Sequence, residues 1–537
     1  MNFQTHAKQY IYILRKVGNF FMVQKIKQHR FTFYSLIATV LVCLGTALLQ
    51  GNSSFYYAEH KIKTSFFVLC FFLYGISFFH LKAKKQLNEK TCVFMILLGG
   101  LLLRSYYVIF TGVYDRQHDQ GVFTGLNNSE INPGHLGYIE YLCKFNKLPD
   151  FHPYSVLSYY HPPLYYILAA LFLKLNITFG VEEALAFENI QILTMFFSSL
   201  CILVSYSILN HLKVQKQSLL LGVSLIAFFP GMILLSGSIN NDILAILFLF
   251  LCFYRTLLWI EHKNIKNLLL IGLTLALGMI TKLNAAVLAF PLAMIFLLYF
   301  MEEIKLGHFW KQIRNFSLFG LLTGGIGLSW VIRNLVLFRA LPAAISNSSE
   351  SILYMGNSSL WDIFGIPYDL NIKYPFHTVY GKTCSNSWLI LLRTSLFGEM
   401  RPGSSGPELS DMMLTLCQIL YLIAFVTMFL SFFYILYAQI RKIRTGNPKE
   451  KELSIFYITG YLVIILTFLA FVLKYPFTCS ADFRYIALVL IYIPISMGQI
   501  DHMKKTKGLN YFHSIMKLNY SLILVLSVLI YLFWNQF

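Results

Sequence analysis

Charged residues are scarce in this sequence. Asp, Glu, Lys and Arg make up 12% of its 537 residues, whereas hydrophobic residues make up 57%. A soluble domain needs a more polar surface than that, so no sizeable soluble domain is expected in the chain. The mean hydropathy of +0.61 instead predicts an integral membrane protein that crosses the bilayer many times.

Cysteine patterns and metal motifs are also lacking. The nine cysteines are scattered without any C-x-x-C spacing, so neither a zinc site nor a disulfide framework is indicated. Cys143, Cys384 and Cys479 fall in segments expected outside the membrane and stay candidates for pairing. Because no D-x-D motif occurs, no metal ligands and no certain cofactor are predicted, although neighbouring carboxylates leave an optional divalent cation, magnesium or manganese, open.

Long apolar runs fill most of the chain. Windows of about 17 to 23 apolar residues have the length that a spanning helix needs, and they predict about thirteen transmembrane helices. These are expected near 32–50, 64–81, 91–110, 188–210, 217–236, 243–260, 267–281, 285–301, 315–332, 412–438, 454–473, 485–500 and 518–534.

The apolar run 162–179 needs a different interpretation. Counting it as a span would place the acidic stretch V-E-E-A-L-A-F-E on the cytoplasmic side and the basic stretch H-L-K-V-Q-K-Q outside. We therefore expect an interfacial helix on the outer leaflet, with Pro162 and Pro163 at its first turn, although a spanning helix stays open.

Lys and Arg outnumber Asp and Glu by 43 to 24. If residues 1–31 are cytoplasmic and the spans alternate, nearly all of this excess lies in the cytoplasmic connections, as the positive-inside bias requires. The basic balance thus reflects membrane topology, and no nucleic-acid partner is expected. Low alanine with abundant Lys, Ile and Asn is typical of a low-GC bacterium, which favours a bacterial plasma membrane.

Once this topology is assigned, the unusual polar residues collect on the outer side. They are Asp115, His118, Asp119, His161, Asn240, Asn241, Asp242, Lys282, Asn284, Arg333, Glu399, Arg401, Asp482 and Arg484. Such a collection favours binding or chemistry over simple linkage.

The residue types in this set suit group transfer from an anionic lipid to an alcohol. Asp115 or Asp119 would take a proton from an incoming hydroxyl, which is the work of a general base. The basic members would neutralise a phosphate or pyrophosphate at the outer leaflet; they are Lys282, Arg333, Arg401 and Arg484.

Several motifs occur in a fixed order between about 91 and 500. Asp119 follows an early span, H-L-G-Y-I-E-Y-L covers 135–142, and H-P-P-L-Y starts at His161. Further along come S-G-S-I-N-N-D ending at Asp242, T-K-L-N at 281–284, W-V-I-R-N at 330–334 and A-D-F-R-Y at 481–485. In this order they resemble the GT-C superfamily of polyprenyl-phosphate-sugar-dependent glycosyltransferases, close to the protein O-mannosyltransferase and aminoarabinose-transferase branch (family 39/83 type).

The resemblance implies an all-α, GT-C-like membrane bundle and an inverting sugar transfer at the extracytoplasmic face. The donor would be a polyprenyl-phosphate-linked sugar within the membrane lipid, and the acceptor a hydroxyl on a glycan, lipid or protein. Asp119 would be the base, with Asp115 as a competitor, and Asp242 would position the acceptor or a cation. Substrate-binding residues would be His118, Tyr138, His161, Tyr165, Lys282, Arg333, Glu399, Arg401 and Arg484.

This chain departs from the family pattern at two places. His161 replaces the lysine often found before Pro-Pro, and extra residues separate Asp119 from Tyr138. The family's donor and acceptor are therefore not carried over.

The resemblance also divides the chain into regions. We expect a cytoplasmic N-terminus with two extra spans in 1–90, a GT-C-like catalytic module in 91–332 with an outer loop at 111–187, a long extracytoplasmic loop in 333–411 and C-terminal spans in 412–537. The stretch S-W-L-I-L-L-R-T-S-L-F-G-E-M at 387–400 is expected to form a lipid-contacting helix.

Structural alternatives stay open for single residues. Asp242 after two asparagines also fits a helix N-cap, and His161 before two prolines also fits a turn. Arg104, inside a span, either snorkels outward or lines a substrate cavity. Tyrosines close to His161 are candidates for stacking on a sugar; they are Tyr159, Tyr160, Tyr165 and Tyr166.

Two other classes of protein compete with the enzyme. A transporter or flippase of a lipid-linked saccharide also needs many spans, but such proteins place their charged sites near the midplane and often show paired halves. A silent scaffold that only binds polyprenyl lipid is the third possibility. The gathering of polar residues at one face favours the enzyme.

Overall fold

The computed structural model describes residues 30–113, 134–156, 158–340, 354–366, 372–376, 385–398, 409–503 and 506–533. Within these ranges the regular secondary structure is helical, apart from one isolated antiparallel bridge between Tyr354 and Phe477. Ten of the described helices are long and apolar enough to cross a membrane, or eleven if one bent pair counts as a span. The predicted all-α polytopic class is therefore confirmed, and the protein is an integral, multi-pass membrane protein.

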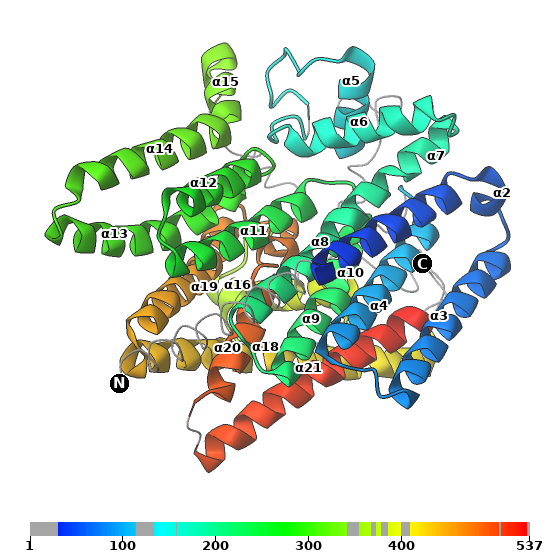
Figure 1. The fold of residues 1–537 in the computed structure, drawn as a ribbon. Helices are drawn as coiled ribbons and strands as arrows, with labels where there is room; N and C mark the ends of the chain where they lie inside the picture. Colours follow the sequence, from blue (N-terminus) through cyan, green and yellow to red (C-terminus); the bar gives the residue numbers. More distant parts are fainter. Residues whose placement is uncertain are drawn as a thin grey trace, which may run out of the picture.

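Figure 1 shows how the helices pack against one another. The first half comprises Arg30–Gln50, α2 (Ser53–Tyr56), α3 (His60–Ala83), α4 (Glu89–Phe110), α5 (Gly134–Phe145), α6 (Leu164–Thr178), α7 (Glu183–Glu188), α8 (Ile190–His211), α9 (Lys216–Phe228), α10 (Pro230–Gly237), α11 (Asp242–Glu261) and α12 (Ile265–Met279). The second comprises η1 (Leu283–Leu288), α13 (Ala289–Lys305), α14 (Phe309–Gly327), α15 (Ser329–Phe338), α16 (Leu360–Phe364), α17 (Ser387–Phe397), α18 (Asp411–Thr445), α19 (Pro448–Lys474), η3 (Thr478–Ala481), η4 (Phe483–Tyr485), α20 (Val489–Asp501) and α21 (Lys507–Phe533).

All thirteen predicted spans coincide with helices, but three of these helices are not simple spans. The helices at 267–281 and 485–500 are α12 and α20, which have only 15 and 13 residues. The window 315–332 is divided between α14 and α15, which meet at an angle of 55°. The described part of the chain thus contains ten or eleven full-length spans, and short or broken helices supply the difference.

Helix starts follow side-chain capping. The side chains of Asn88, Asn264 and Ser410 accept backbone N–H groups at the first turns of α4, α12 and α18. Asn447 and Glu450 form a reciprocal capping box at the start of α19, with Pro448 at the first helical position. Such caps satisfy donors that a helix end leaves without partners.

The helices alternate in direction, so each end of the bundle has its own set of connections. At one end, Lys263 pairs with Glu452 at 2.6 Å and Lys449 pairs with Glu261 at 3.1 Å. These residues all fall in connections predicted to be cytoplasmic. Among the described residues predicted to be outside, Asp242, Lys282 and Arg484 lie at the other helix ends, while the side of the membrane that each end faces stays a prediction.

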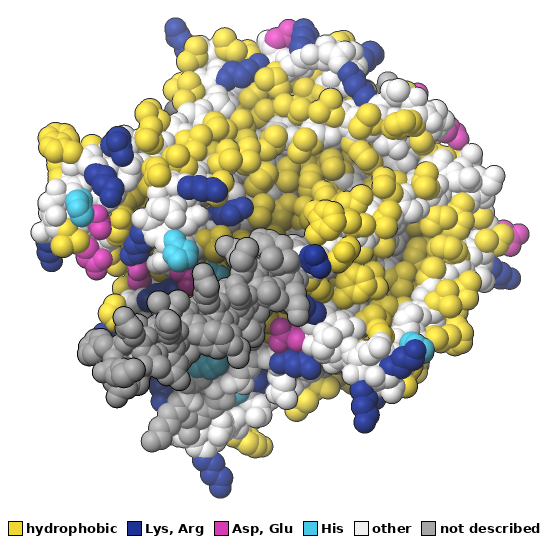
Figure 2. All heavy atoms as spheres, in the orientation of Figure 1, with side chains coloured by type: hydrophobic (Ala, Val, Ile, Leu, Met, Phe, Trp, Pro, Cys, Tyr) yellow, Lys and Arg dark blue, Asp and Glu magenta, His cyan; other side chains and the backbone are white. Residues whose placement is uncertain are grey.

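Helices α4, α8, α9, α10 and α11 form the interior of the bundle, and their side chains are mostly buried. By contrast, α3 buries only Phe67 and exposes large apolar side chains such as Phe72 and Phe79. Figure 2 shows a broad hydrophobic surface with Lys and Arg side chains towards its margins. Apolar exposure on this scale suits contact with lipid chains.

A proline interrupts one interior span. Pro230 has no N–H to give to the carbonyl of Ile226, so α9 ends at Phe228 and α10 begins at Pro230. Arg104 of α4 takes up the freed carbonyls, since its Nη1 lies 2.7 Å from the Ala227 oxygen and its Nη2 lies 3.1 Å from the Ile226 oxygen. Its Nε donates to Ser198 at 2.9 Å.

Arg104 therefore neither snorkels nor lines a cavity, because it is completely buried. Its guanidinium supplies hydrogen bonds at the carbonyl end of a broken helix, where the helix dipole favours a cation.

The expectation of a lipid-contacting helix at 387–400 is wrong for the described residues 387–397. In α17 every residue except Trp388 is buried, including the arginine Arg393. The helix packs against α10, α18, η3 and η4, so its apolar side chains face protein.

The segment predicted to be the first long outer loop contains three helices, α5, α6 and α7; α5 and α6 lie with α15 at the top of Figure 1. Helix α6 has 15 residues, about 22 Å of helix, which is shorter than the roughly 30 Å hydrocarbon core. It buries Ala169 and Leu173 and exposes Leu171 and Leu175. This two-sided character is compatible with the predicted interfacial helix, whose place at the membrane stays a prediction.

Replacing Arg104 tests its role at the helix break. Arg104→Met leaves two buried carbonyls without donors, so we expect a loss of about 3 kcal/mol in the free energy of unfolding. The loss is measured as a lower Tm of the detergent-solubilised protein. Arg255→Met is the control, because Arg255 is half-buried with no hydrogen bond or ion pair to any described residue; equal losses in both variants would contradict the assignment.

Candidate functional site

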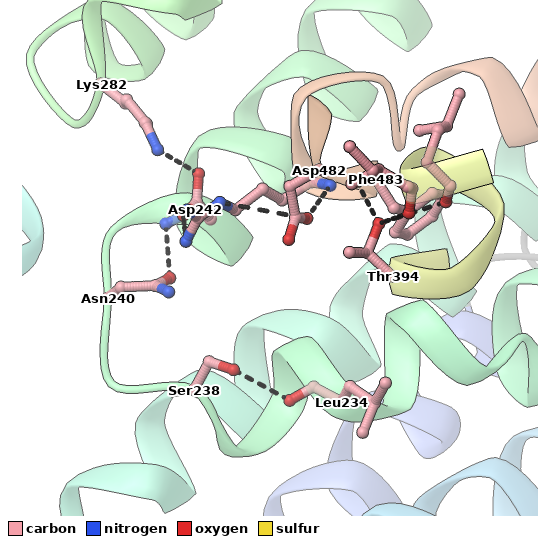
Figure 3. Close-up of polar contacts among 11 residues, drawn as sticks. Leu234, Ser238, Asn240, Asp242, Lys282, Thr394, Asp482 and Phe483 are labelled. Atoms are coloured by element: carbon pink, nitrogen blue, oxygen red, sulfur yellow. Dashed lines mark hydrogen bonds and ion pairs between the residues drawn. The ribbon is translucent and has the colours of Figure 1, made fainter. Parts of the chain in front are cut away.

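Charged residues from distant parts of the chain meet at the predicted outer end of the bundle. The Asp242 carboxylate forms a salt bridge through Oδ1 with Nζ of Lys282, and its Oδ2 lies 3.6 Å from Nη1 of Arg484. We call Asp242, Lys282, Asp482 and Arg484 the ion cluster; Figure 3 shows Lys282 and Asp482 on opposite sides of Asp242. The side chains of Asp242 and Arg484 are almost fully buried, so each charge requires compensation there.

Asp242 is the first residue of α11. Its backbone N–H donates to Oδ1 of Asn240 at 3.0 Å, whereas Nδ2 of Asn241 donates to the carbonyl of Thr281 at 2.8 Å. The N-cap position belongs to Asn241. The interpretation of Asp242 as a cap is therefore wrong, and its carboxylate is turned towards the cations.

Lys282 reaches the cluster from the turn between α12 and η1. Its N–H donates to the carbonyl of Gly278, and its side chain extends over the ring of Tyr485, with Nζ 5.1 Å from the ring centre. The guanidinium of Arg484 lies 5.3 Å from the same centre. The face of an aromatic ring attracts cations, so Tyr485 helps to hold both basic groups.

The short helix η4 positions Arg484. Asp482 caps it, since Oδ1 accepts the N–H of Arg484 at 2.9 Å, and Thr394 of α17 accepts the N–H of Phe483 at 3.1 Å. Gly231 of α10 allows the close approach of Phe483, because a Cβ there would lie 2.5 Å from that ring. Buried α17 thus supports the segment that bears Arg484.

A second group of side chains lies on α5, on α6 and in the turn before α6. We call His135, Tyr138, Tyr159, His161 and Tyr166 the aromatic cluster. Tyr138 stacks on Tyr159 and Tyr166, with ring centres 4.6 and 4.3 Å apart. His135 stacks on His161 at 5.5 Å, and a 2.6 Å hydrogen bond joins its Nδ1 to Oη of Tyr166.

The two clusters are neighbours. The N–H of Leu164, at the start of α6, donates to the carbonyl of Ile280 at 3.2 Å, two residues before Lys282. Burial raises the pKa of the Tyr166 phenol well above its ordinary value, and nearby tyrosines and the negative charge of Asp242 add to the rise. Tyr166 therefore stays protonated and keeps a hydroxyl donor beside the ion cluster.

Arg333 of α15 borders the aromatic cluster. Its guanidinium donates to the carbonyl of Pro149 and to Oδ1 of Asn334, and it lies 4.8 Å from the ring centre of Trp330. Burial raises the pKa of Tyr138, and the charge of Arg333 opposes that rise. Among the described residues, no carboxylate forms a salt bridge with Arg333.

The structure thus brings together Asp242, Lys282 and Arg484 in one group, and Tyr138 and His161 in another. Tyr165 is fully buried and packs edge-on against Tyr166 at 5.4 Å. The other predicted site residues lie outside the described residues; they are Asp115, His118, Asp119, Glu399 and Arg401.

No group of three or more His, Cys, Asp or Glu side chains suited to a metal ion occurs within the described ranges. The optional divalent cation stays a prediction, since Asp115 and Asp119 lie outside these ranges. Cys143 carries a free thiol, and Cys384 also lies outside the described ranges.

Sequence reasoning missed the roles of His135 and Asp482. His135 precedes Tyr138 by three residues, so a helix places both side chains on one face. This spacing was the signal in the sequence that could have identified His135 as a neighbour of Tyr138. Asp482 precedes η4 by one residue and has the position of an N-cap. No sequence pattern links either residue to its distant neighbours.

An all-helical membrane protein whose charged side chains meet at one set of helix ends is consistent with the architecture of the GT-C glycosyltransferases. Residues 160–323 match the family model of dolichyl-phosphate-mannose-protein mannosyltransferase. This segment is therefore similar to a family of GT-C type, and the predicted resemblance is confirmed over these residues. It contains His161, Asp242 and Lys282. Comparison with curated protein sequences found no match.

Solved structures of archaeal oligosaccharyltransferases are similar to the chain. The apo oligosaccharyltransferase of Archaeoglobus fulgidus has a TM-score of 0.44 and 12% identity, over 82% of this chain and 56% of that chain. The archaeal oligosaccharyltransferase AglB of Archaeoglobus fulgidus, in complex with an inhibitory peptide and a dolichol-phosphate, has a TM-score of 0.43 and 13% identity, over 84% of this chain and 56% of that chain. The chain thus spans little more than half the length of that protein.

A double-mutant cycle tests the ion cluster. Asp242→Asn and Lys282→Met are each expected to destabilise the protein, because each leaves a buried charge with fewer partners. Combined, they should cost less than the sum of the two, with a coupling of about 1 to 3 kcal/mol in the free energy of unfolding.

The exposed pair Lys147 and Asp150, at 2.6 Å, provides the matched control cycle. Lys147→Met with Asp150→Asn should show no measurable coupling, because solvent screens exposed ion pairs. Additive effects at Asp242 and Lys282 would contradict their pairing.

Proposed function

We propose that this protein transfers a sugar from a polyprenyl-phosphate donor to a hydroxyl acceptor at the extracytoplasmic face, with inversion at the anomeric carbon. The observation that carries the proposal is the ion cluster, in which the family-matched segment supplies Asp242 and Lys282 at the helix ends. The acceptor, whether glycan, lipid or protein, is one whose hydroxyl reaches that end of the bundle.

The charges suggest where the donor phosphate binds. Within the ion cluster, the two cations Lys282 and Arg484 are balanced by the carboxylates of Asp242 and Asp482. A phosphate adds negative charge, so a further cation is needed beside the cluster. Arg333, whose described partners are carbonyl oxygens and rings, provides it in the forked geometry that suits phosphate.

The acceptor hydroxyl needs a base that it can reach. Both oxygens of Asp242 already face cations, so a hydroxyl would have to displace one of them. Asp242 then acts by keeping Lys282 and Arg484 in place, while Asp119 takes the proton and the lipid phosphate leaves. Asp115 is the alternative base.

The sugar would lie against accessible rings beside this site. His161 and Tyr160 are half-buried, with ring centres 4.3 Å apart, and the exposed Tyr154 stacks on Tyr160 at 5.8 Å. Stacked rings of this kind offer apolar faces to the C–H groups of a sugar. Fully buried Tyr138 and Tyr165 pack on Tyr166, which in turn stacks on His161 at 6.5 Å.

A flippase would place its charged groups towards the middle of the membrane. In this protein Asp242 begins α11, Lys282 follows α12 and Arg484 precedes α20, so all three lie at helix ends. This placement favours chemistry at the headgroup level over passage through the bundle.

A donor panel tests the reaction. Purified protein incubated with polyprenyl-phosphate sugars and hydroxyl acceptors should consume one donor, measured by mass spectrometry of the lipid. Asp119→Asn should lower the rate about 10²- to 10⁴-fold, the usual contribution of a general base. A folded Asp119→Asn variant with full transfer would remove the base assignment, and Asp115→Asn in parallel distinguishes the two acids.

The phosphate assignment makes a separate prediction. Arg333→Gln should raise the KM for the donor about tenfold, as expected when one charge-assisted contact of about 1.5 kcal/mol or more is lost. Arg339→Gln, six residues later at an exposed position, is the matched control and should leave KM unchanged. Equal KM values in the two variants would exclude Arg333 from the donor site.

A further inference from the structure

A buried carboxylate lies where α4 leaves the bundle, and neither the ion cluster nor the aromatic cluster uses it. Glu188 ends α7 and is only 8% exposed. The backbone N–H of Val113 donates to both of its oxygens, at 3.2 Å to Oε1 and 3.0 Å to Oε2. Val113 is three residues beyond the last residue of α4.

Side-chain donors also surround the Glu188 carboxylate. Nε2 of Gln191 donates to Oε2 at 2.9 Å, and Oη of Tyr56 donates to Oε1 at 3.1 Å. An ionised carboxylate accepts hydrogen bonds at both oxygens, and donated hydrogen bonds stabilise that form. Lys63 adds positive charge nearby. The carboxylate of Glu188 therefore holds a backbone amide in surroundings that favour its charged form.

Gln191 adds a second hydrogen bond to the same segment of the chain. Its side-chain nitrogen Nε2, which donates to Glu188, also donates to the carbonyl of Thr111 at 3.0 Å. Thr111 is thus held by Gln191 at the start of α8, and Val113 by Glu188 at the end of α7. Two hydrogen-bonded anchor points within three residues define the position and the direction in which the chain leaves α4.

Tyr56 brings the N-terminal helices into this arrangement. It belongs to α2, in the region without a match to the family motifs, and Nζ of Lys63 lies 5.0 Å from its ring centre. The same region packs on the outer end of α4, where His60 and Phe67 contact Phe110 at 5.0 and 5.8 Å between ring centres. The two extra spans therefore contact the exit of α4.

We propose that Glu188 is a positioning residue for the sugar transfer. We also propose that residues 30–83 contribute to this positioning through the hydrogen bond from Tyr56 to Glu188. The inference rests on the proposed function, in which Asp115 or Asp119 is the base. Asp115 follows Val113 by two residues and Asp119 by six, so they reach at most about 7 and 21 Å from it. The position of Val113 therefore limits where either candidate base can lie along the continuous chain.

The first experiment measures the anchor without any substrate. Hydrogen–deuterium exchange of the protein in lipid nanodiscs is followed for the peptide that contains Val113. Glu188→Gln replaces one acceptor oxygen by an NH₂ group that opposes the donors, so exchange of the Val113 amide should accelerate about tenfold or more. Unchanged exchange would overturn the anchor.

The second experiment measures transfer with whichever polyprenyl-phosphate sugar the donor panel identifies. Glu188→Gln should lower kcat about 10- to 100-fold, as a misplaced catalytic group does, with KM for the donor changed by no more than about twofold. A fall in kcat with constant KM, at a concentration of folded enzyme measured by size-exclusion chromatography, distinguishes positioning from general destabilisation, which removes active enzyme in proportion to the unfolded fraction.

Tyr56→Phe and Tyr57→Phe form a matched pair. Each removes one hydroxyl from adjacent tyrosines, but Tyr57 is 64% exposed. Tyr56→Phe should lower kcat about fivefold, the effect of one hydrogen bond, and Tyr57→Phe should leave it unchanged. Equal rates in these two folded variants would overturn the role of the N-terminal helices even if Glu188→Gln fails to fold.

Amide exchange and kcat together distinguish a failure of the positioning role from a failure of the proposed sugar transfer. Faster exchange with an unchanged kcat would overturn the positioning role. If the wild type consumes no donor at all, the proposed function fails, and the exchange result alone then decides whether Glu188 anchors the chain.

Discussion

The predicted outer end of this bundle depends on the pairing of one buried carboxylate, Asp242, with Lys282 and Arg484. In a medium of low polarity none of these charges is stable alone, so the starts of α11 and η4 and the end of α12 cannot separate. The pairing also crosses the boundary of the family-matched segment, since Arg484 lies far beyond residue 323. The C-terminal helices are therefore part of the site.

The sequence predicted the parts of this arrangement that depend on the length of the apolar segments and on the distribution of charged residues between their two ends. Apolar windows indicated the helices, and charge indicated their alternation, which brought Asp242, Lys282 and Arg484 to the same end. It did not predict the contacts. Which oxygen meets which cation depends on two asparagine side chains, Asn240 and Asn241, that fix the turn before α11, and such turns have no periodic pattern.

Two errors have a common physical origin. An apolar helix has the same composition whether it faces lipid or protein, so the interior position of α17 left no trace in its hydropathy. The role of Arg104 depends on carbonyls that are available only because Pro230 breaks a helix 126 positions later in the chain. Both features arise from tertiary contacts. The base, by contrast, stays a prediction, because Asp115 and Asp119 lie outside the described residues.

The bond between Arg104 and the broken helix has a consequence for biogenesis. In the order of synthesis Arg104 precedes Ser198 by 94 residues and Ile226 by 122, and until these residues appear only the carbonyl of Gly100, in its own helix, accepts a hydrogen bond from its guanidinium. A charge within a span is costly until it is paired, so α4 is less stable in the bilayer alone than beside its later neighbours. The hydrogen bonds of this arginine thus couple α4 to α8, α9 and α10, which follow it by about a hundred residues in the chain.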